Sequence, residues 1–302
     1  RDLARRGRAL DPVVEGCAAV LGYEGLDGRV RRTRIAFDPV PESWGPREAR
    51  YTVRLAPRGE FVCVVVVSCD PGPGEPEPTL SAYESAFADA GAALRAAMAE
   101  DAHVYTSNEQ FNDWWNRSRA DLHLMATETP HGPYPYAGVP WFSTVFGRDG
   151  LVTAFETLWA NPTFARGVLG HLAATQADEE DAERDAQPGK ILHEARAGEM
   201  AALGEIPFGR YYGSVDATPL FVWLAGAYYA RTGDRALVER LWPHVDRALR
   251  WMDTYGDPDG DGFLEYARRS PRGLVNQGWK DSHDAVFHAD GALAEPPIAL
   301  CE

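Results

Sequence analysis

The sequence has almost no lysine, and its apolar stretches are short. Lys190 and Lys280 are the only lysines among 30 basic residues, and arginine supplies the others. With abundant alanine and glycine, this arginine bias is typical of a GC-rich bacterial gene. The longest apolar run, at residues 61–67, has the length of a strand, far below the roughly 18 residues of a membrane span. The sequence therefore predicts no membrane-spanning segment.

Positive charge is scarce as well. The 302 residues contain 45 acidic and 30 basic side chains, which gives a net charge of −15. A surface this acidic repels the phosphates of nucleic acids and of anionic lipids. We therefore expect neither a nucleic acid nor a membrane among the partners, and the sequence leaves the oligomeric state open.

Cysteine is rare, and the four cysteines are Cys17, Cys63, Cys69 and Cys301. Cys63 and Cys69 would lie about 20 Å apart on one extended strand, too far for a disulfide. No pair has the spacing of a metal site. Free thiols in a reducing compartment are the preferred interpretation, so the predicted location is the cytoplasm. The chain begins at Arg1 without a signal peptide and stops within an apolar helical pattern, so we expect both ends to be truncated.

Strand patterns dominate residues 1–70. Residues 49–55 alternate between apolar and polar side chains, and residues 61–69 form a β-branched run typical of a sandwich core. Proline and glycine turns between them predict a partial antiparallel β-sandwich. The Pro/Gly-rich stretch at residues 70–78 predicts a linker, so residues 71–104 are interpreted as a linker and an alanine-rich connecting helix.

Helical patterns begin at about residue 105. Ser107 and Gln110 have the spacing of a capping box at the start of the first helix. Pro162 predicts the start of one later helix, and Gly233 predicts the end of another. The later helices are predicted at residues 151–159, 161–176, 218–231 and 234–255. The fold is therefore mainly α, and the long loops between the helices are expected to carry the function.

An aromatic, proline-rich loop precedes an Arg-Asp pair. Trp141 and Phe142 offer flat faces that suit the apolar side of a sugar ring, and Arg148 with Asp149 offers donors and acceptors for a diol. The alternative is an ion pair that caps a helix. Farther along, Glu194 lies among charged neighbours that form a polar cleft edge or a solvated surface loop.

Asp216 and Asp281 are the next candidates. Asp216 precedes an apolar helix, where it either contacts a ligand or serves, like Ser214, as the N-cap. Asp281 follows Trp279 and Lys280, and a carboxylic acid beside tryptophan suits glycoside hydrolysis if partial burial keeps its proton in place. Lys280 opposes this if it lies close to the acid, and otherwise holds a sugar hydroxyl. The alternative for this segment is a polar turn.

Three aspartates at residues 257–261 imitate the first half of a calcium loop. Asp257, Asp259 and Asp261 occupy the first, third and fifth positions, but Arg268 stands where the twelfth needs a glutamate. A turn is therefore the preferred interpretation, and calcium the alternative.

Three of these segments resemble one known family. Through residues 140–142, 146–150 and 278–282 the chain resembles the amylo-alpha-1,6-glucosidase or glycogen debranching enzyme family, and more broadly the glucoamylase-like inverting glycosidases. The resemblance covers residues 105–302 and, more weakly, the N-terminal strands. It implies an incomplete (α/α)6 toroid of the six-hairpin glycosidase type, with residues 105–302 as the N-terminal half of the catalytic domain, preceded by a partial antiparallel β-sandwich.

The resemblance also implies residue roles. Asp281 corresponds to the general acid, and Arg148 with Asp149 to the residues that bind the terminal glucose, with Trp141 as a wall. Glu194 and Asp216 correspond to substrate-binding positions. The family's general base is a glutamate nearer the C-terminus, for which this sequence has no match, so we expect the fragment itself to be inactive.

The predicted function is inverting hydrolysis of α-glucans, at α-1,6 branch points, without a cofactor. The expected partner is an α-glucan or another neutral oligosaccharide. Two alternatives stay open: the aromatic cleft binds a glycan without cleaving it, or the chain is another toroid glycosidase or lyase. Lyase substrates are anionic and fit a protein of charge −15 less well.

Overall fold

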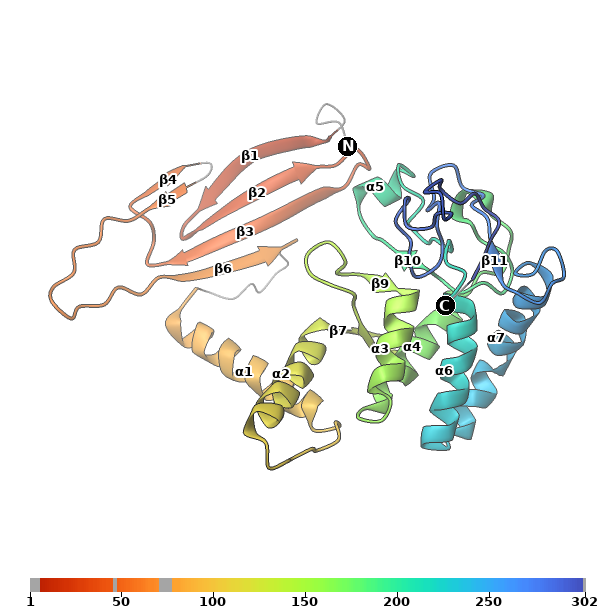
Figure 1. Cartoon of the computed structure of the whole chain (residues 1–302). Coiled ribbons are helices and arrows are strands. Elements are labelled where there is room, and N and C mark those ends of the chain that lie inside the picture. Colours follow the sequence, from red (N-terminus) through yellow and green to blue (C-terminus); the bar gives the residue numbers. More distant parts are fainter. Residues whose placement is uncertain (1–5, 46–47, 71–77, 301–302) are drawn as a thin grey trace. The chain divides into compact units, whose positions relative to one another are not determined.

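The computed structural model describes residues 6–45, 48–70 and 78–300, and the chain divides into two compact units, Arg1–Arg95 and Ala96–Glu302 (Figure 1). Helices make up 36% and strands 20% of the structure. Residues 71–77 of the predicted linker lie outside the described residues, as do Arg1 and Cys301 near the two ends. None of the helices in the described part combines the length and the apolar character that crossing a bilayer requires.

The first unit is built on a four-stranded antiparallel sheet with strand order β1-β2-β3-β6. Its strands are β1 (Arg8–Glu15), β2 (Ala18–Glu24), β3 (Val30–Asp38) and β6 (Val64–Cys69). Gly16, with φ 58°, supplies the left-handed residue of the tight turn from β1 to β2. The short strands β4 (Ser43–Gly45) and β5 (Glu48–Arg50) form a separate hairpin.

The predicted partial β-sandwich is wrong, because the described strands form one open sheet and a hairpin instead of two facing sheets. Residues 51–55, whose alternation predicts a strand, have no regular secondary structure, and Leu55 is 59% exposed. Within the described strands of the sheet only Ala18, Ala36 and Val64 are buried. An alternating pattern predicts which face of a strand would pack against a second sheet, but it does not show whether the chain forms that second sheet.

The second unit contains most of the helices. After α1 (Leu80–Met98), which has no buried residue and spans the boundary between the units, come α2 (Glu109–Met125), α3 (Gly147–Thr157), α4 (Pro162–Ala174), α5 (Glu199–Ala202), α6 (Ala217–Thr232) and α7 (Arg235–Thr254). The short strands are β7 (Ala126–Thr129), β8 (Gly132–Pro135), β9 (Val145–Phe146), β10 (Glu194–Ala195), β11 (Glu265–Tyr266) and β12 (Ile298–Ala299). The core lies between α3, α4, α6 and α7 and includes Leu151, Val168, Phe221 and Leu241.

Local signals place the helix ends. Asn161 caps α4 by accepting a hydrogen bond from the Thr163 amide, with Pro162 at the first position, and Gly233 ends α6 with φ 68°. The capping box predicted at Ser107 is wrong, because the side chain of Asn108 accepts from the Phe111 amide and so caps α2.

The predicted incomplete (α/α)6 toroid is also wrong for the structure. The described residues contain seven α-helices, and the four that share the main core pack as one cluster instead of a ring of alternating inner and outer hairpins. The helical structure between α4 and α6 consists of the four-residue helix α5 and one 3₁₀ turn, and the chain after α7 contains no helix up to residue 300. These loop-rich stretches lack the long helices that would close a ring.

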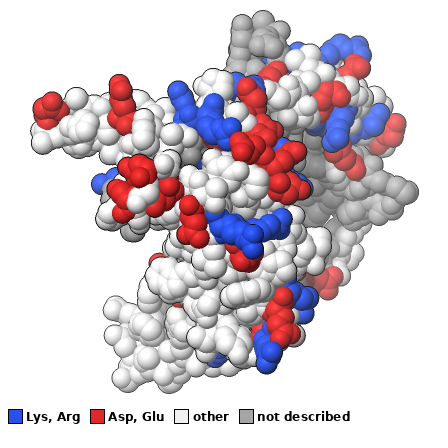
Figure 2. Space-filling view, turned by 90° about the vertical axis from the view of Figure 1, so that its right-hand side faces the viewer, with Lys and Arg blue, Asp and Glu red and all other residues white. Residues whose placement is uncertain are grey.

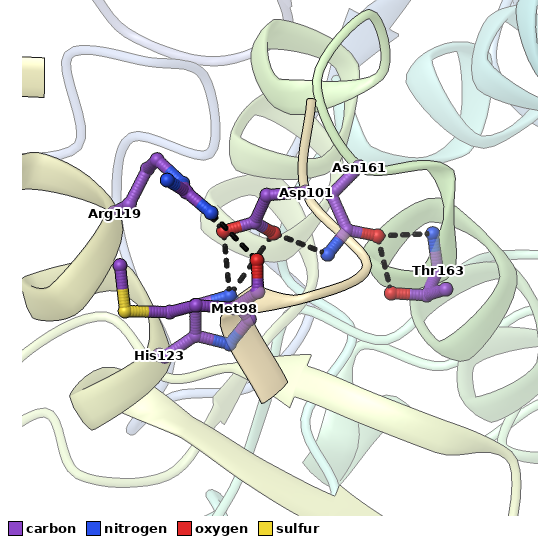
Figure 3. A network of polar contacts seen from close by, with 6 residues as sticks. All are labelled: Met98, Asp101, Arg119, His123, Asn161 and Thr163. Carbon is purple, nitrogen blue, oxygen red and sulfur yellow. Dashed lines mark hydrogen bonds and ion pairs between the residues drawn. The ribbon is translucent and has the colours of Figure 1, made fainter. Parts of the chain in front are cut away.

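A buried polar network fastens the segment after α1 to α2 and α4 (Figure 3). The carboxylate of Asp101 accepts hydrogen bonds from Arg119 Nε at 2.8 Å and from Asn161 Nδ2 at 2.7 Å, and it lies 3.0 Å from His123 Nε2. Arg119 also donates to the Met98 carbonyl at 2.6 Å. Because the Asp101 side chain is only 4% exposed, these partners replace the water that the carboxylate loses on folding.

Candidate active site

Arg148, in the first turn of α3, joins three distant segments. Its side chain is only 6% exposed. Nε donates to Asp216 Oδ2 at 2.5 Å, and Nη2 donates to the Gly278 carbonyl at 2.8 Å. Nη1 lies 3.4 Å from Asp281 Oδ2. One buried guanidinium therefore brings the start of α3, the start of α6 and the loop at residues 276–284 together.

The start of α3 lies directly against the chain at residues 192–195. A Cβ on Gly147 would lie 1.9 Å from the Leu192 carbonyl oxygen, so only glycine permits this approach. The Gly147 amide donates to the His193 carbonyl at 2.8 Å, and β9 pairs with β10, with Phe146 opposite Glu194. This packing places Glu194 beside the helix turn that carries Arg148.

Asp216 stands at the N-cap position of α6, but its side chain makes no capping bond. Instead the hydroxyl of Ser214 donates to Asp216 Oδ1 at 2.5 Å and accepts from the Ala217 amide at 3.3 Å. Of the two N-cap candidates from the sequence, Ser214 therefore satisfies the helix end. The carboxylate of Asp216 is left for Arg148.

A cavity of about 390 Å³ lies beside this arginine. Its lining residues are Arg148, Val152, Asp216, Pro219, Leu220, Trp223, Trp279 and Leu300. The ring centroid of Trp279 lies 5.8 Å from the guanidinium carbon of Arg148. The cavity thus combines a charged end with an apolar, aromatic wall, which is the combination that a sugar ring requires from its binding site.

Asp281 and Lys280 lie outside this lining. The Asp281 side chain is 43% exposed, with Arg148 as its ion-pair partner, so it stands at the edge of the site and not in a dry pocket. Lys280 is exposed and does not line the cavity. The structure therefore brings Arg148, Asp216, Trp279 and Asp281 together and leaves Lys280 at the surface.

The aromatic loop residues also lie apart from the cavity. Trp141 is 76% exposed, and its carbonyl accepts a hydrogen bond from Arg196 Nη1 at 2.8 Å. Phe142 is also exposed, and its ring contacts Phe146 with a centroid distance of 5.8 Å. Neither side chain is among the cavity-lining residues.

Two further carboxyl groups near the site, those of Glu194 and Asp149, have raised pKa values. Burial raises the pKa of Glu194, and nearby Asp149 and Asp281 raise it further, although an ion pair with Arg196 lowers it. The residue Asp149 is exposed, but surrounding protein atoms still remove part of its hydration, which raises its pKa despite the adjacent Arg148. Both acids are therefore easier to protonate than in water.

His193 is a buried titratable residue near the start of α3. Its ring lies between those of Phe146 and Tyr211, with centroid distances of 5.9 and 5.8 Å. Burial lowers the pKa of His193 to about 3, and the cations Arg148 and Lys190 contribute to the shift. The imidazole is therefore neutral at physiological pH, and its Nδ1 atom has no hydrogen-bond partner in the described structure.

The three aspartates of the calcium-like loop lie close together. Oxygen atoms of Asp257, Asp259 and Asp261 all fall within 4.8 Å of one another. The Asp257 carboxylate accepts hydrogen bonds from the amides of Gly260 and Gly262, at 2.8 and 3.0 Å. These bonds belong to a turn, the preferred interpretation from the sequence, and calcium at these aspartates stays an alternative.

The motifs of the sequence did not predict the apolar wall of the cavity. Leu220 and Trp223 follow Asp216 at four and seven positions along α6, so the three side chains lie on one face of the helix. That spacing is the signal that would have found them. Val152 holds the equivalent place on α3, four residues after Arg148.

Comparison with known proteins bears on the N-terminal part of the chain. Residues 1–65 match a family described as the N-terminal domain of (some) glycogen debranching enzymes. Glycogen debranching enzymes are glycoside hydrolases, and the match covers 65 of the 302 residues. No curated protein matches the chain. The residues around Arg148 lie outside the matched region, and their chemistry rests on their own geometry.

Proposed function

We propose that the chain forms the proton-donating side of a glycosidase site that acts on α-glucans at α-1,6 branch points. The observation that carries the proposal is the guanidinium of Arg148, which holds Asp216 and Asp281 beside the 390 Å³ cavity. Carboxylates and a guanidinium supply acceptors and donors for neighbouring sugar hydroxyls. Trp223 and Trp279 supply faces for the ring, and the glycogen-related N-terminal match favours an α-glucan.

In the proposed reaction Asp281 protonates the glycosidic oxygen while an oxocarbenium-like centre forms. Because the Asp281 side chain is 43% exposed, the bound glucan has to displace water from it before the proton moves. Inversion needs a second carboxylate about 6.5–9.5 Å away, which activates a water on the opposite face of the sugar. No residue is assigned as that base, and Asp149 and Glu194 are placed among the substrate-binding groups.

A neutral substrate agrees with the charge distribution. The protein carries a net charge of −15, and on the face drawn in Figure 2 basic side chains lie next to acidic ones. A neutral glucan approaches such a surface without the repulsion that a polyanion meets. We propose a cytoplasmic location for the reaction, with no nucleic-acid or membrane partner.

The test is glucose release from a branched dextrin by a longer form of the protein that also carries the glutamate base, because the 302 residues alone are expected to be inactive. The anomeric form of the product is followed by NMR. The proposal expects β-glucose as the first product, and a loss of about 100-fold or more in rate for Asp281→Asn. The matched control is Asp284→Asn, which alters a carboxylate of the same loop whose side chain is 67% exposed. Equal rates for the wild type and Asp281→Asn would remove Asp281 from the mechanism.

A second candidate is glycan binding without cleavage. The exposure of Asp281 favours it, because a proton donor works best where water is excluded. Calorimetry with maltooligosaccharides separates the two functions. Binding by the longer form without any glucose release supports the binding function, whereas release that depends on Asp281 supports the hydrolase.

A further inference from the structure

A second cavity reaches the chain segment that carries Asp216. Its volume is about 170 Å³, and Val215, the neighbour of Asp216, contributes to its wall. Lys190 and Glu265 line the same cavity, and neither takes part in the proposed hydrolysis. Two cavities that share no lining residue therefore meet the chain at Val215 and Asp216.

Lys190 presents unused hydrogen-bond donors to this cavity. The residue is 5% exposed, and its ammonium lies 5.5 Å from the ring centroid of Trp251. Its recorded hydrogen bond, to the Asp185 carbonyl, is long at 3.4 Å, while an ammonium can donate three. The Asp185 carboxylate is occupied elsewhere, because one oxygen accepts from the amides of Arg269 and Ser270.

Glu265 presents an unused acceptor to the same cavity. Its Oε2 atom is buried and has no hydrogen-bond partner among the described residues. Burial raises the pKa of Glu265, and the neighbouring carboxylates of Asp259 and Asp261 raise it further. The described structure records no ion pair between Glu265 and Lys190, so both polar ends are available to a guest.

The rest of the wall contains the polar residues Asp185, Gln187 and Arg269 beside aromatic and apolar ones. The aromatic and apolar residues include Val215, Trp251, Tyr255, Pro258, Tyr266 and Pro297. An anionic guest would meet Glu265 with the aspartates near it, and a cationic guest would meet Lys190. A neutral molecule with several hydroxyls avoids both conflicts, since each hydroxyl can accept from the ammonium or donate to the carboxylate.

We propose that this cavity binds one neutral sugar unit, with Lys190 and Glu265 as its polar contacts. The aromatic and proline side chains pack against the C–H face of the ring. The site is separate from the cavity beside Arg148, and the inference does not depend on hydrolysis at Asp281.

The scarcity of lysine makes the proposal testable in the intact chain. Lys190 reports on this cavity, and Lys280 reports on the segment next to Asp281. Lysines are methylated with formaldehyde and dimethylamine-borane, with and without D-glucose, and each site is followed by peptide mass spectrometry. At about ten times its Kd, glucose is expected to slow methylation of Lys190 about tenfold, because only the unbound fraction reacts.

Glu265→Leu removes the acceptor at similar volume and is expected to abolish the protection of Lys190. The matched control is Glu239→Leu, which alters a glutamate on α7 that is 63% exposed, and this variant keeps the protection. Protection that survives in Glu265→Leu would overturn the assignment of that contact and with it the proposal.

Four other results would also overturn the proposal. If Lys190 is not methylated in the absence of glucose, the cavity is closed even to formaldehyde and admits no sugar. If glucose leaves the rate at Lys190 unchanged, nothing is bound there. If sodium phosphate protects Lys190 as well as glucose does, the cavity is an anion site. Protection of Lys280 alone would support the hydrolase site while overturning this one.

Discussion

Arg148 and Asp149 illustrate how neighbours in sequence take different tasks. The sequence predicts that the pair grips one diol, but Arg148 is buried while Asp149 is exposed. Consecutive residues of a helix point in directions about 100° apart, so the two side chains do not face the same partner. The guanidinium instead forms ion pairs with Asp216 and Asp281. These partners are distant in sequence, so the adjacent Arg-Asp pair does not predict them.

His193 makes the stability of the protein depend on pH. Its pKa in the folded protein is about 3, against 6.5 in an unfolded chain, so only the unfolded form takes up a proton between these values. Stability therefore falls as the pH drops from 6.5 toward 3, by up to roughly 4–5 kcal/mol from this residue. Urea unfolding at pH 7, 6, 5 and 4 should show a shallower decline for His193→Gln than for the wild type.

The control for this measurement is His283→Gln, because the His283 side chain is 81% exposed. Its pH dependence should follow that of the wild type. If the unfolding free energies of His193→Gln and the wild type fall in parallel from pH 7 to 4, the buried imidazole does not cause the loss of stability in acid.

At the level of elements, the helices of the second unit and strand β6 were predictable, whereas the strand expected at residues 51–55 was not found. The starts and ends of α4 and α6 depend on Asn161, Pro162 and Gly233, which act within one turn of chain. Residues 51–55 alternate like a strand but lack a partner in the structure. Strand formation depends on such distant partners, and a local pattern cannot provide them.

Asp101 is expected to stabilise the packing of the segment after α1 against α2 and α4. Asp101→Ala leaves Arg119, His123 and Asn161 without their shared carboxylate in a buried position. Removing one partner from such a network costs about 3–5 kcal/mol of unfolding free energy. Urea denaturation measures the loss.

The matched control for this network lies on the outer face of α2. Asp121 pairs with Arg117 four residues earlier, and both side chains are exposed. Asp121→Ala should therefore leave the urea midpoint almost unchanged. A similar loss of stability in both variants would contradict the assignment of Asp101 as a buried anchor.

Two helical glycines should respond to alanine with opposite sign. A Cβ on Gly167 would lie 2.1 Å from the Pro133 carbonyl oxygen, so Gly167→Ala forces α4 away from β8 and costs about 1–3 kcal/mol. A Cβ on Gly226 of α6 meets no atom within 4 Å, so Gly226→Ala should stabilise the protein by about 0.5–1 kcal/mol. Thermal unfolding should give a melting temperature below the wild type for Gly167→Ala and above it for Gly226→Ala. If Gly167→Ala melts at the wild-type temperature, the contact between α4 and β8 is looser than described.

For the whole molecule, the sequence predicted some of the site and not the architecture. Arg148 and Asp281 were placed together through a resemblance, and their side chains lie 3.4 Å apart across 133 positions of sequence. The toroid was not found, because motif spacing does not fix how many long helices a chain forms or how they close. The apolar wall at Trp223 was overlooked because its part in a cavity depends on the packing of α3 against α6.

The sequence separation between Arg148 and Asp281 also determines when their contact can form during translation. A ribosome that adds about 5–20 residues per second needs roughly 7–27 seconds to translate the 133 positions between them. Asp216, 68 positions after the arginine, emerges first and can neutralise the guanidinium in the meantime. The aspartate that we propose as the acid joins last, so the nascent chain completes its charge cluster only when the loop at residues 276–284 has left the exit tunnel.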